Sequence, residues 1–215
     1  MARRELSETT RAALVEAAIA EFAAHGFDGA STRSIAARAG VHQPQINYHF
    51  ESKADLWGAA LDHLFAELSA ELTGAALSAD GDLEVLRNSI RTVVRHAAKR
   101  PELNRMMVKE SSVVSERLTW LTEQHVRSLF DIHSALWNRL RVKGQVADLD
   151  VLTAFYVLIG GSTLLYSNSP EARLLSGDDP MDPTRIEAHA DAMVALLTRS
   201  TPVAATRHHT TRTTT

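Results

Sequence analysis

Residues 31–50, STRSIAARAGVHQPQINYHF, constrain the fold more than any other stretch of this 215-residue chain. They contain no acidic residue, carry Gly40 near their middle and end in a run of aromatic side chains. We expect two short helices, 31–39 and 43–50, joined by a turn at Gly40, because apolar residues occur at helical spacing on both sides of it. Helices this short bury little apolar surface alone, so they must pack against a neighbour.

The second of these short helices has two different faces. Ile46 and Phe50 lie four residues apart and are expected to point inward, because residues at that spacing share one side of a helix. This arrangement turns polar side chains toward solvent or a ligand, namely Gln45, Asn47 and His49. The pattern predicts a helix-turn-helix whose second helix enters the major groove of DNA.

Longer helices are expected on either side of this motif. A helix over 7–25 precedes it, with apolar residues at four-residue intervals, and Gly26 is suited to end that helix with a positive φ. Further helices are predicted over 53–77, 83–99, 101–110, 116–142, 150–167 and 184–199, with a loop over 169–183. No segment alternates as a strand would, so the predicted fold is all-α with about nine helices.

Two domains and a tail are expected from this pattern. Residues 1–52 make the helix-turn-helix domain, residues 53–199 a helical domain, and the threonine-rich residues 200–215 a disordered tail. The chain has no cysteine, which excludes disulfides and thiolate metal sites, and no apolar run of about 20 residues that would span a bilayer. We therefore expect a cytoplasmic protein without a membrane contact, metal or cofactor.

The charge balance does not by itself favour nucleic acid. The chain has a net charge of −3, and residues 1–55 hold six basic and seven acidic side chains, so this segment is close to neutral. Phosphate contacts are local, because salt screens charges beyond about 10 Å. Binding then depends on which faces carry the basic groups and on a second copy of the chain, since one head without net positive charge should bind weakly.

Three segments together resemble the tetracycline-repressor (TetR) family of bacterial regulators: HGFDGAS, TRSIAARAGV and INYHFESKADLW. The resemblance implies an N-terminal helix-turn-helix DNA-binding domain, followed by a C-terminal helical domain for effector binding and dimerisation. It further implies a homodimer that an effector releases from DNA. The leading hypothesis is then a repressor that binds a palindromic operator in double-stranded DNA, and the later helices suggest a small, mainly apolar effector.

The resemblance also implies which residues contact DNA. Ser31, Thr32 and Arg33 would hold phosphates, and Lys53 would bind the backbone at the start of the next helix. The recognition helix would supply the remaining contacts: His42, Gln43, Pro44, Gln45, Asn47, Tyr48 and His49. The sequence departs from the family at His42, where a serine is common, and at Asn47, where an aromatic residue is common.

The residue types allow alternative interpretations of these sites. Glutamine and asparagine amides match the donor and acceptor on the adenine edge, but they are also ordinary exposed polar groups. Tyr48 and His49 suit phosphate contacts better than base contacts, because most protein–DNA hydrogen bonds position the protein. A cation at a helix start is electrostatically unfavourable, so Lys53 is better explained by a phosphate than as a plain surface lysine.

Bulky and polar residues on the later helices are candidates for an effector pocket, although each also suits an ordinary core. Methionine and aromatic side chains adapt to ligands in helical bundles. His125 and His133 lie eight residues apart, but no third group at helical spacing supports a metal site. The candidates are Asn104, Arg105, Met106, Met107, Trp120, His125, Phe130, His133, Trp137, Phe155 and Tyr156.

Two adjacent glycines within an apolar helix indicate close packing. Each costs about 1 kcal/mol relative to alanine in a helix, so a neighbouring helix should approach there. We expect a four-helix interface between two subunits, with packing inside one subunit as the alternative. The candidate interface residues are Gly160, Gly161, Leu164, Ile186, Met193, Leu196 and Leu197.

Two other classes of function remain at this point. One is a helical-bundle carrier or enzyme with a vestigial DNA-binding head, although no nucleophile elbow, phosphate loop or carboxylate pair supports catalysis. The other is an activator or architectural DNA-binding protein, which an effector would not release.

Overall fold

The computed structural model describes residues 2–199, with side chains from residue 7 onward; the predicted disordered tail lies outside this range. Within residues 2–199 the regular structure is helical, and Val146 and Thr198 form an isolated bridge. The predicted all-α fold is confirmed. The helices are α1 (Ala2–Gly29), α2 (Thr32–Arg38), α3 (Pro44–His49), α4 (Lys53–Leu77), α5 (Asp82–Lys99), α6 (Pro101–Glu110), α7 (Glu116–Leu121), α8 (Arg127–Val142), α9 (Val151–Ser167), α10 (Ser169–Ser176) and α11 (Pro183–Leu197).

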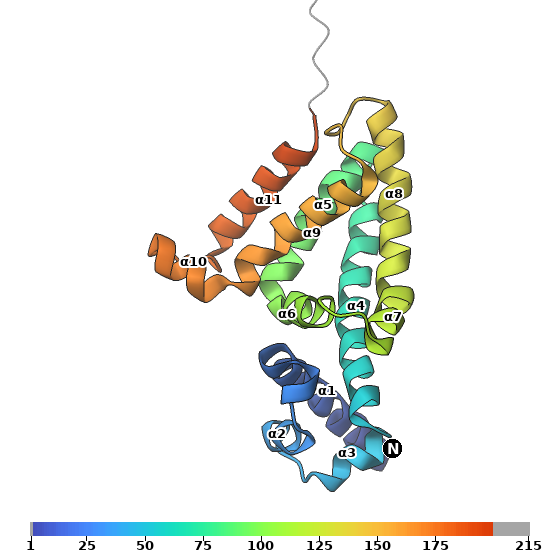
Figure 1. Ribbon diagram of the computed structural model, residues 1–215, viewed down its shortest axis with the longest axis vertical. Helices are drawn as coiled ribbons and strands as arrows, with labels where there is room; N and C mark the ends of the chain where they lie inside the picture. Colours follow the sequence, from blue (N-terminus) through green and yellow to red (C-terminus); the bar gives the residue numbers. More distant parts are fainter. Residues whose placement is uncertain (1, 200–215) are drawn as a thin grey trace, which may run out of the picture.

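Figure 1 shows two parts joined by α4. The helices α1–α3, which we call the head, gather at one end, and α5–α11, which we call the body, gather at the other. One hydrophobic core lies in the head and includes the first half of α4, together with Leu103, Met106 and Leu121 from the body. A second core lies between α5, α8, α9 and α11. Helix α4 therefore ties the head to the body.

Most predicted helix boundaries agree with the structure within one or two residues. Helix α4 and helix α6 begin and end at the predicted residues. Helix α1 instead continues to Gly29, four residues beyond the predicted end, although it breaks at Gly26, where φ is 73°. The glycine was thus correctly expected to take a positive φ, but one more helical turn follows it.

Two features of the body differ from the prediction. The expected loop over 169–183 contains α10, because Pro170 lies in the first helical turn, where proline is tolerated, and Gly177 ends the helix with a φ of 73°. Helix α10 is therefore an addition to the nine helices expected. The predicted helix over 116–142 contains a π turn at Thr122–Val126, which separates α7 from α8.

No single helix among residues 2–199 is long and apolar enough to cross a bilayer. Only α9 and α10 together reach that length and composition, and they meet at an angle of 74°.

Candidate nucleic-acid interface

The turn between α2 and α3 follows from three local features of the sequence. Ser31 caps α2 by accepting a hydrogen bond from the Ser34 amide at 3.0 Å, and the Ser34 side chain completes the capping box. Ile35 and Ala36 are buried in the head core, where α2 packs against α1. Gly40 adopts a φ of 69°, which lets the Val41 amide donate to the Ala36 carbonyl at 3.0 Å. The motif predicted from residues 31–50 is therefore a compact helix–turn–helix.

Helix α3 presents the two faces that its sequence predicts. Ile46 and Phe50 are 1% and 2% exposed and join the head core. The opposite face is open to solvent, and Tyr48 keeps 77% of its surface exposed. Five predicted DNA-contacting residues besides Tyr48 are likewise exposed on this side of the head: His42, Gln43, Pro44, Gln45 and Asn47. Six of the seven predicted recognition residues are therefore exposed, whereas His49 is half-buried.

Two of the exposed amides also have intramolecular roles. The Gln43 side chain donates to the Thr32 hydroxyl at 3.2 Å and so links α3 to the start of α2. The Gln45 side-chain oxygen accepts from the His42 amide at 3.1 Å. The side-chain nitrogen of Gln45 takes no part in this bond. These bonds limit the rotamers of both glutamines before any ligand is bound.

Lys53 has partners inside the head. Its Nζ lies 3.5 Å from the Asp28 carbonyl oxygen and 4.7 Å from the centre of the Phe27 ring. These contacts explain a cation at a helix start, where sequence reasoning favoured a phosphate. The phosphate contact of Lys53 stays a prediction. Its internal contacts were missed because Phe27 and Lys53 are distant in the sequence.

An acidic residue near the interface is neutralised by a neighbour. Glu21 on α1 is buried and accepts a hydrogen bond from the Arg38 guanidinium of α2 at 2.9 Å. That hydrogen bond holds the pKa of Glu21 below its ordinary value of 4.5, against the opposing effect of burial. Arg11 of α1 lies over the Phe50 ring at 5.0 Å, so this cation packs on the head core. The nearly balanced charge count of the head thus includes charges that are paired internally.

The candidate effector residues lie in three separate places. One group, which we call the aromatic cluster, contains Phe130, His133 and Trp137 of α8 with Phe155 of α9. The His133 ring lies 5.6 Å from both the Trp137 and the Phe155 ring, and it is only 8% exposed. Its Nε2 is buried without a hydrogen-bond partner, and burial lowers the pKa of His133 below 6.5, which favours the neutral ring. Tyr156 neighbours this cluster but is 67% exposed.

The other candidates have structural partners elsewhere. The His125 ring stacks on Phe65 at 4.5 Å, and its Nε2 lies 2.9 Å from Asp62, while Trp120 packs on Trp57. Asn104 and Arg105 both bond to Ser167 at the end of α9. Met106 is 3% exposed and belongs to the head core, with Met107 packed against it. The candidates are therefore spread over separate parts of the body, and the two histidines do not converge. Their contact with an effector stays a prediction.

The residues predicted for a dimer interface divide between surface and core. Leu164 and Leu196 are 55% and 64% exposed, as an interface needs, but Met193 and Leu197 are buried in their own subunit. Gly161 packs within the subunit, because a Cβ there would lie 2.7 Å from Met193 Cε, whereas Gly160 faces open space. Of the two glycines, only Gly161 therefore shows close packing within the subunit. Ile186 is half-buried.

Sequence reasoning did not name Leu152 of α9, and it placed Tyr156 among the effector candidates rather than on an exposed face. Leu152 and Tyr156 are 56% and 67% exposed, and with Gly160 and Leu164 they recur every four residues. That spacing places them along one side of α9. The four-residue repeat was the available signal, but α9 is apolar on every side, which hid it.

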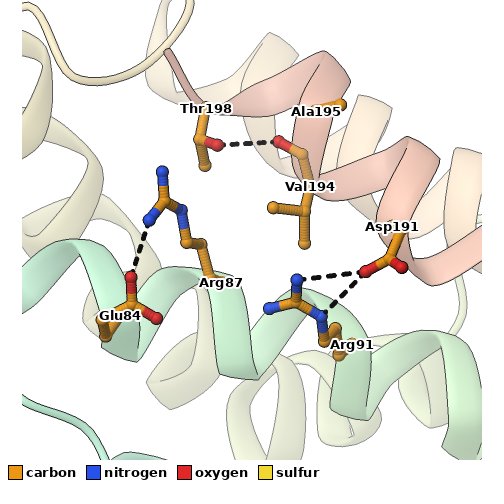
Figure 2. A pocket seen from close by; sticks show the side chains of 7 residues that line it. All are labelled: Glu84, Arg87, Arg91, Asp191, Val194, Ala195 and Thr198. Atoms are coloured by element: carbon orange, nitrogen blue, oxygen red, sulfur yellow. Dashed lines mark hydrogen bonds and ion pairs between the residues drawn. The ribbon is translucent and has the colours of Figure 1, made fainter. Parts of the chain in front are cut away.

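A cavity of about 410 Å³ opens between α5 and α11, away from all the predicted ligand residues. Figure 2 shows two arginines projecting into it from α5, each paired with one carboxylate. Arg87 bonds Glu84 at 2.6 Å, and Arg91 bonds Asp191 at 3.0 Å. These charges cancel, so the cavity presents no excess of either sign. A second cavity of about 330 Å³ lies where the head meets α6 and α7.

The fold and this surface define a helix-turn-helix protein with a helical body. Residues 14–60 match the sequence profile described as bacterial regulatory proteins of the tetR family. The match spans the head and the first residues of α4, so the likeness to the tetR family lies in this part of the chain.

Two relatives with curated names are both transcriptional repressors. The HTH-type transcriptional repressor SCO4008 of Streptomyces coelicolor is 33% identical over 110 residues, which cover 51% of this chain and 53% of that protein. The HTH-type transcriptional repressor NicS of Pseudomonas putida is 23% identical over 171 residues, which cover 78% of this chain and 80% of that protein. The chain thus matches about half the length of the first relative.

Solved structures share the fold over most of the chain. The structure of AibR in complex with isovaleryl coenzyme A and operator DNA superposes with a TM-score of 0.72 at 16% identity, covering 87% of this chain and 97% of that one. The ketosteroid transcriptional regulator KstR2 of Mycobacterium tuberculosis gives a TM-score of 0.69 at 18% identity, covering 88% and 95%. At these identities the likeness extends to the fold.

Proposed function

We propose that this protein is a ligand-responsive transcriptional repressor that binds a palindromic DNA site as a homodimer. The observation that carries the proposal is α3, whose apolar side is buried in the head while its amide and hydroxyl groups are exposed together. A helix with this polarity fits the major groove, where each base pair offers a distinct set of donors and acceptors. The two relatives named as repressors support the same function.

The exposed side chains suggest a division of roles on DNA. Gln43, Gln45 and Asn47 are suited to base edges, adenine above all, because an amide pairs with its N6 and N7 groups. Phosphates would be held by the rim of the surface, through Ser31, Thr32, Arg33, Tyr48 and His49, with Lys53 if it leaves its internal partners. The protein would act in the cytoplasm and needs no catalytic group for this function.

A dimer would supply the two heads that a palindrome requires. The exposed line Leu152, Tyr156, Gly160 and Leu164 on α9, together with Leu196 on α11, is the surface best suited to pair with a second copy. Symmetric pairing of such a face buries apolar side chains that the monomer leaves in water. Two heads would then bind half-sites about 34–36 Å apart or at multiples of that distance.

The aromatic cluster is the part of the body best suited to receive an effector. Its walls are apolar, and His133 Nε2 is a buried polar atom without a partner, which a ligand could satisfy. Because the ring is held neutral, we expect a mainly apolar effector with one uncharged hydrogen-bonding group. The rings already touch, so entry of the effector would displace side chains between α8 and α9.

Selection of bound duplexes from a random library tests the proposal. The expected result is a palindromic sequence whose affinity for the protein falls as the salt concentration rises. The slope of that fall gives the number of phosphate contacts. Asn47→Ala should lower affinity for the selected duplex, whereas Ala37→Ser, an exposed change outside α3, should not. Failure to select or retain any duplex at low salt would refute the proposal and favour a carrier or enzyme with a vestigial head.

A further inference from the structure

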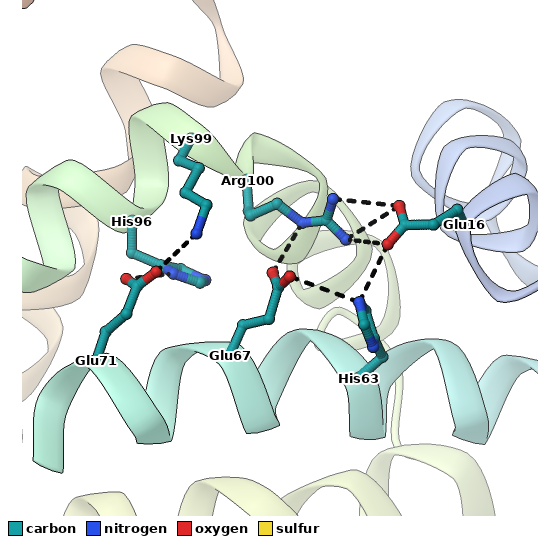
Figure 3. A network of polar contacts seen from close by, with 7 residues as sticks. All are labelled: Glu16, His63, Glu67, Glu71, His96, Lys99 and Arg100. Carbon is teal, nitrogen blue, oxygen red and sulfur yellow. Dashed lines mark hydrogen bonds and ion pairs between the residues drawn. The ribbon is translucent and has the colours of Figure 1, made fainter. Parts of the chain in front are cut away.

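Helix α6 contacts the head through the residue that precedes its N-terminus. Arg100 lies between α5 and α6, and its guanidinium donates to the Glu16 carboxylate of α1 at 3.1–3.2 Å. Its Nε lies 3.1 Å from the Glu67 carboxylate of α4. Figure 3 shows this side chain between the two carboxylates. Because the side chain is only 17% exposed, the contact is largely shielded from solvent.

Helix α6 contacts the same head helix again near its other end. Lys109 Nζ donates to the Ala24 carbonyl of α1 at 2.6 Å, just before the break at Gly26. A helix leaves its last carbonyls without intrahelical partners, so this end can accept a bond from outside. Glu16 and Ala24 are eight residues apart, or about 12 Å along α1 at about 1.5 Å per residue.

The middle of α6 is bonded to the body. Asn104 Nδ2 donates to the Ser167 hydroxyl at 2.7 Å, and Arg105 Nε donates to the Ser167 carbonyl at 3.1 Å. Ser167 ends α9, the helix that contributes Phe155 to the aromatic cluster. A displacement of α9 along its axis would therefore pull on α6 and on both of its contacts with α1.

We propose that α6 is a two-point clamp that sets the direction of α1, and with it the head, relative to the body. Arg100 and Lys109 are its head-positioning residues. A single contact would let α1 pivot, whereas two contacts at separate points on one helix fix its direction. The clamp holds whether or not the protein binds DNA, but its effect on an operator rests on the function proposed above.

The charges around Arg100 make it the stronger of the two contacts. A guanidinium engages carboxylates through a planar fork, which fixes geometry as well as distance. Without Arg100, Glu16 and Glu67 would face each other with like charge, and His63 would remain as their shared partner, at 3.0 and 3.5 Å. Loss of Arg100 thus replaces an attraction between head and body with a repulsion.

Lys99 provides a matched control one residue away. Its Nζ bonds the Glu71 carboxylate at 2.9 Å, so it ties α5 to α4 rather than to α1. Lys99→Gln removes a cation and one hydrogen bond between helices, as Lys109→Gln does, although the acceptor of Lys99 is a carboxylate and that of Lys109 a carbonyl. It should leave the direction of α1 unchanged.

Distance measurements between two spin labels test the clamp in the full chain. The sequence has no cysteine, so Ala37→Cys on α2 and Asn138→Cys on α8, both exposed, place one label on the head and one on the body. Dilution with unlabelled protein keeps the measured distance within one chain. We expect a single narrow distribution for the parent and for Lys99→Gln. Arg100→Gln and Lys109→Gln should each lose the narrow peak, and the double variant should lose it most completely.

Two further outcomes keep the test decisive. If Arg100→Gln does not fold, Arg100→Lys keeps the charge but not the fork, and a parent-like distribution for that variant would overturn the clamp. A folded double variant with the parent distribution would overturn it too, whatever the protein does with DNA.

Affinity for the selected duplex tests the consequence. We expect the double variant to bind it about five- to tenfold more weakly than Lys99→Gln does, within the usual range of coupling between sites. Equal affinity in the two variants would overturn this role. Loss of the narrow peak in a protein that selects no duplex would support the clamp and refute only the proposed function.

Discussion

The head and the body expose different kinds of side chain. In the described part of α1–α3, Tyr48 is the one large hydrophobic side chain that is exposed, and its neighbours on α3 are amides. The body, in contrast, exposes apolar side chains on several helices, among them Ile132 at 66%, Leu152 at 56%, Leu174 at 89% and Leu196 at 64%.

This difference indicates different partners for the two parts. The head has used its apolar residues in its own core and has kept hydrogen-bonding groups for its surface, which suits a polar partner such as DNA. The body leaves apolar side chains in water at a cost of about 25 cal/mol for each Å², so a protein partner that covers them would gain that free energy. A dimer formed through the body would bury its exposed apolar side chains, and DNA bound at the head would pair with its exposed hydrogen-bonding groups.

The largest effect should come from truncating the head core. Phe50→Ala removes a side chain that is 2% exposed, and we expect a loss of about 3–5 kcal/mol in the free energy of unfolding. Leu174→Ala, at an 89% exposed site in the body, should change it by less than about 0.5 kcal/mol. Urea denaturation measures both, and equal losses would mean that Leu174 is covered in solution.

A charge on the exposed line of α9 should separate the subunits. Leu164→Glu places a carboxylate where we expect the partner's apolar side chains, and burying an unpaired charge costs several kcal/mol. Sedimentation should show a dimer for the parent and a monomer for the variant, with unchanged helix content. Glu123→Gln, an exposed change on the π turn, serves as the control. A dimer that survives Leu164→Glu would place the interface elsewhere.

A smaller effect is expected from one amide of the head. Asn47→Ala removes a base contact, which should cost about 1–3 kcal/mol of binding to the selected duplex. The salt slope should stay the same, because no phosphate contact is lost. Titration at several salt concentrations separates the two terms. A changed slope with unchanged specificity would make Asn47 a backbone contact.

The smallest effect should be a difference in acid sensitivity. Burial lowers the pKa of His133 below 6.5, and that of His189 shifts the same way, so the unfolded chain takes up protons first as the pH falls. The body should therefore lose stability below about pH 6.5, whereas the lowered pKa of Glu21 in the head acts only below about 4.5.

His133→Phe measures the share of this effect that belongs to one ring. The drop in the free energy of unfolding between about pH 7.5 and about pH 5.5 should be smaller in the variant than in the parent. Urea midpoints at both values provide the measurement. An identical drop in the two proteins would show that His133 is protonated in the folded state.

Much of the head could be predicted from the sequence because its structure is set locally. Ile46 and Phe50 are four residues apart, Gly40 needs its positive φ, and Ser31 caps the helix that begins at the next residue. Each of these signals acts within one or two helical turns. Lys53 was the exception, since its partners Asp28 and Phe27 come from another helix.

The body was predicted less well because its contacts join residues that are far apart. Arg100 meets Glu16 across 84 positions, and Asn104 meets Ser167 across 63. No short sequence pattern predicts such pairs. Residue type alone also could not separate Met106, which fills the core shared with the head, from Phe155, which lies in the aromatic cluster.

The π turn at Thr122–Val126 acts as a phase shift in an otherwise regular helix. One extra residue in a turn rotates everything after it by about 100° about the helix axis, since an α-helix has about 3.6 residues per turn. Deleting a single residue there would restore the regular spiral and swing His133 and Trp137 away from α9. The number of residues in this turn therefore decides which side chains of α8 face α9, as much as the residue types on α8 do.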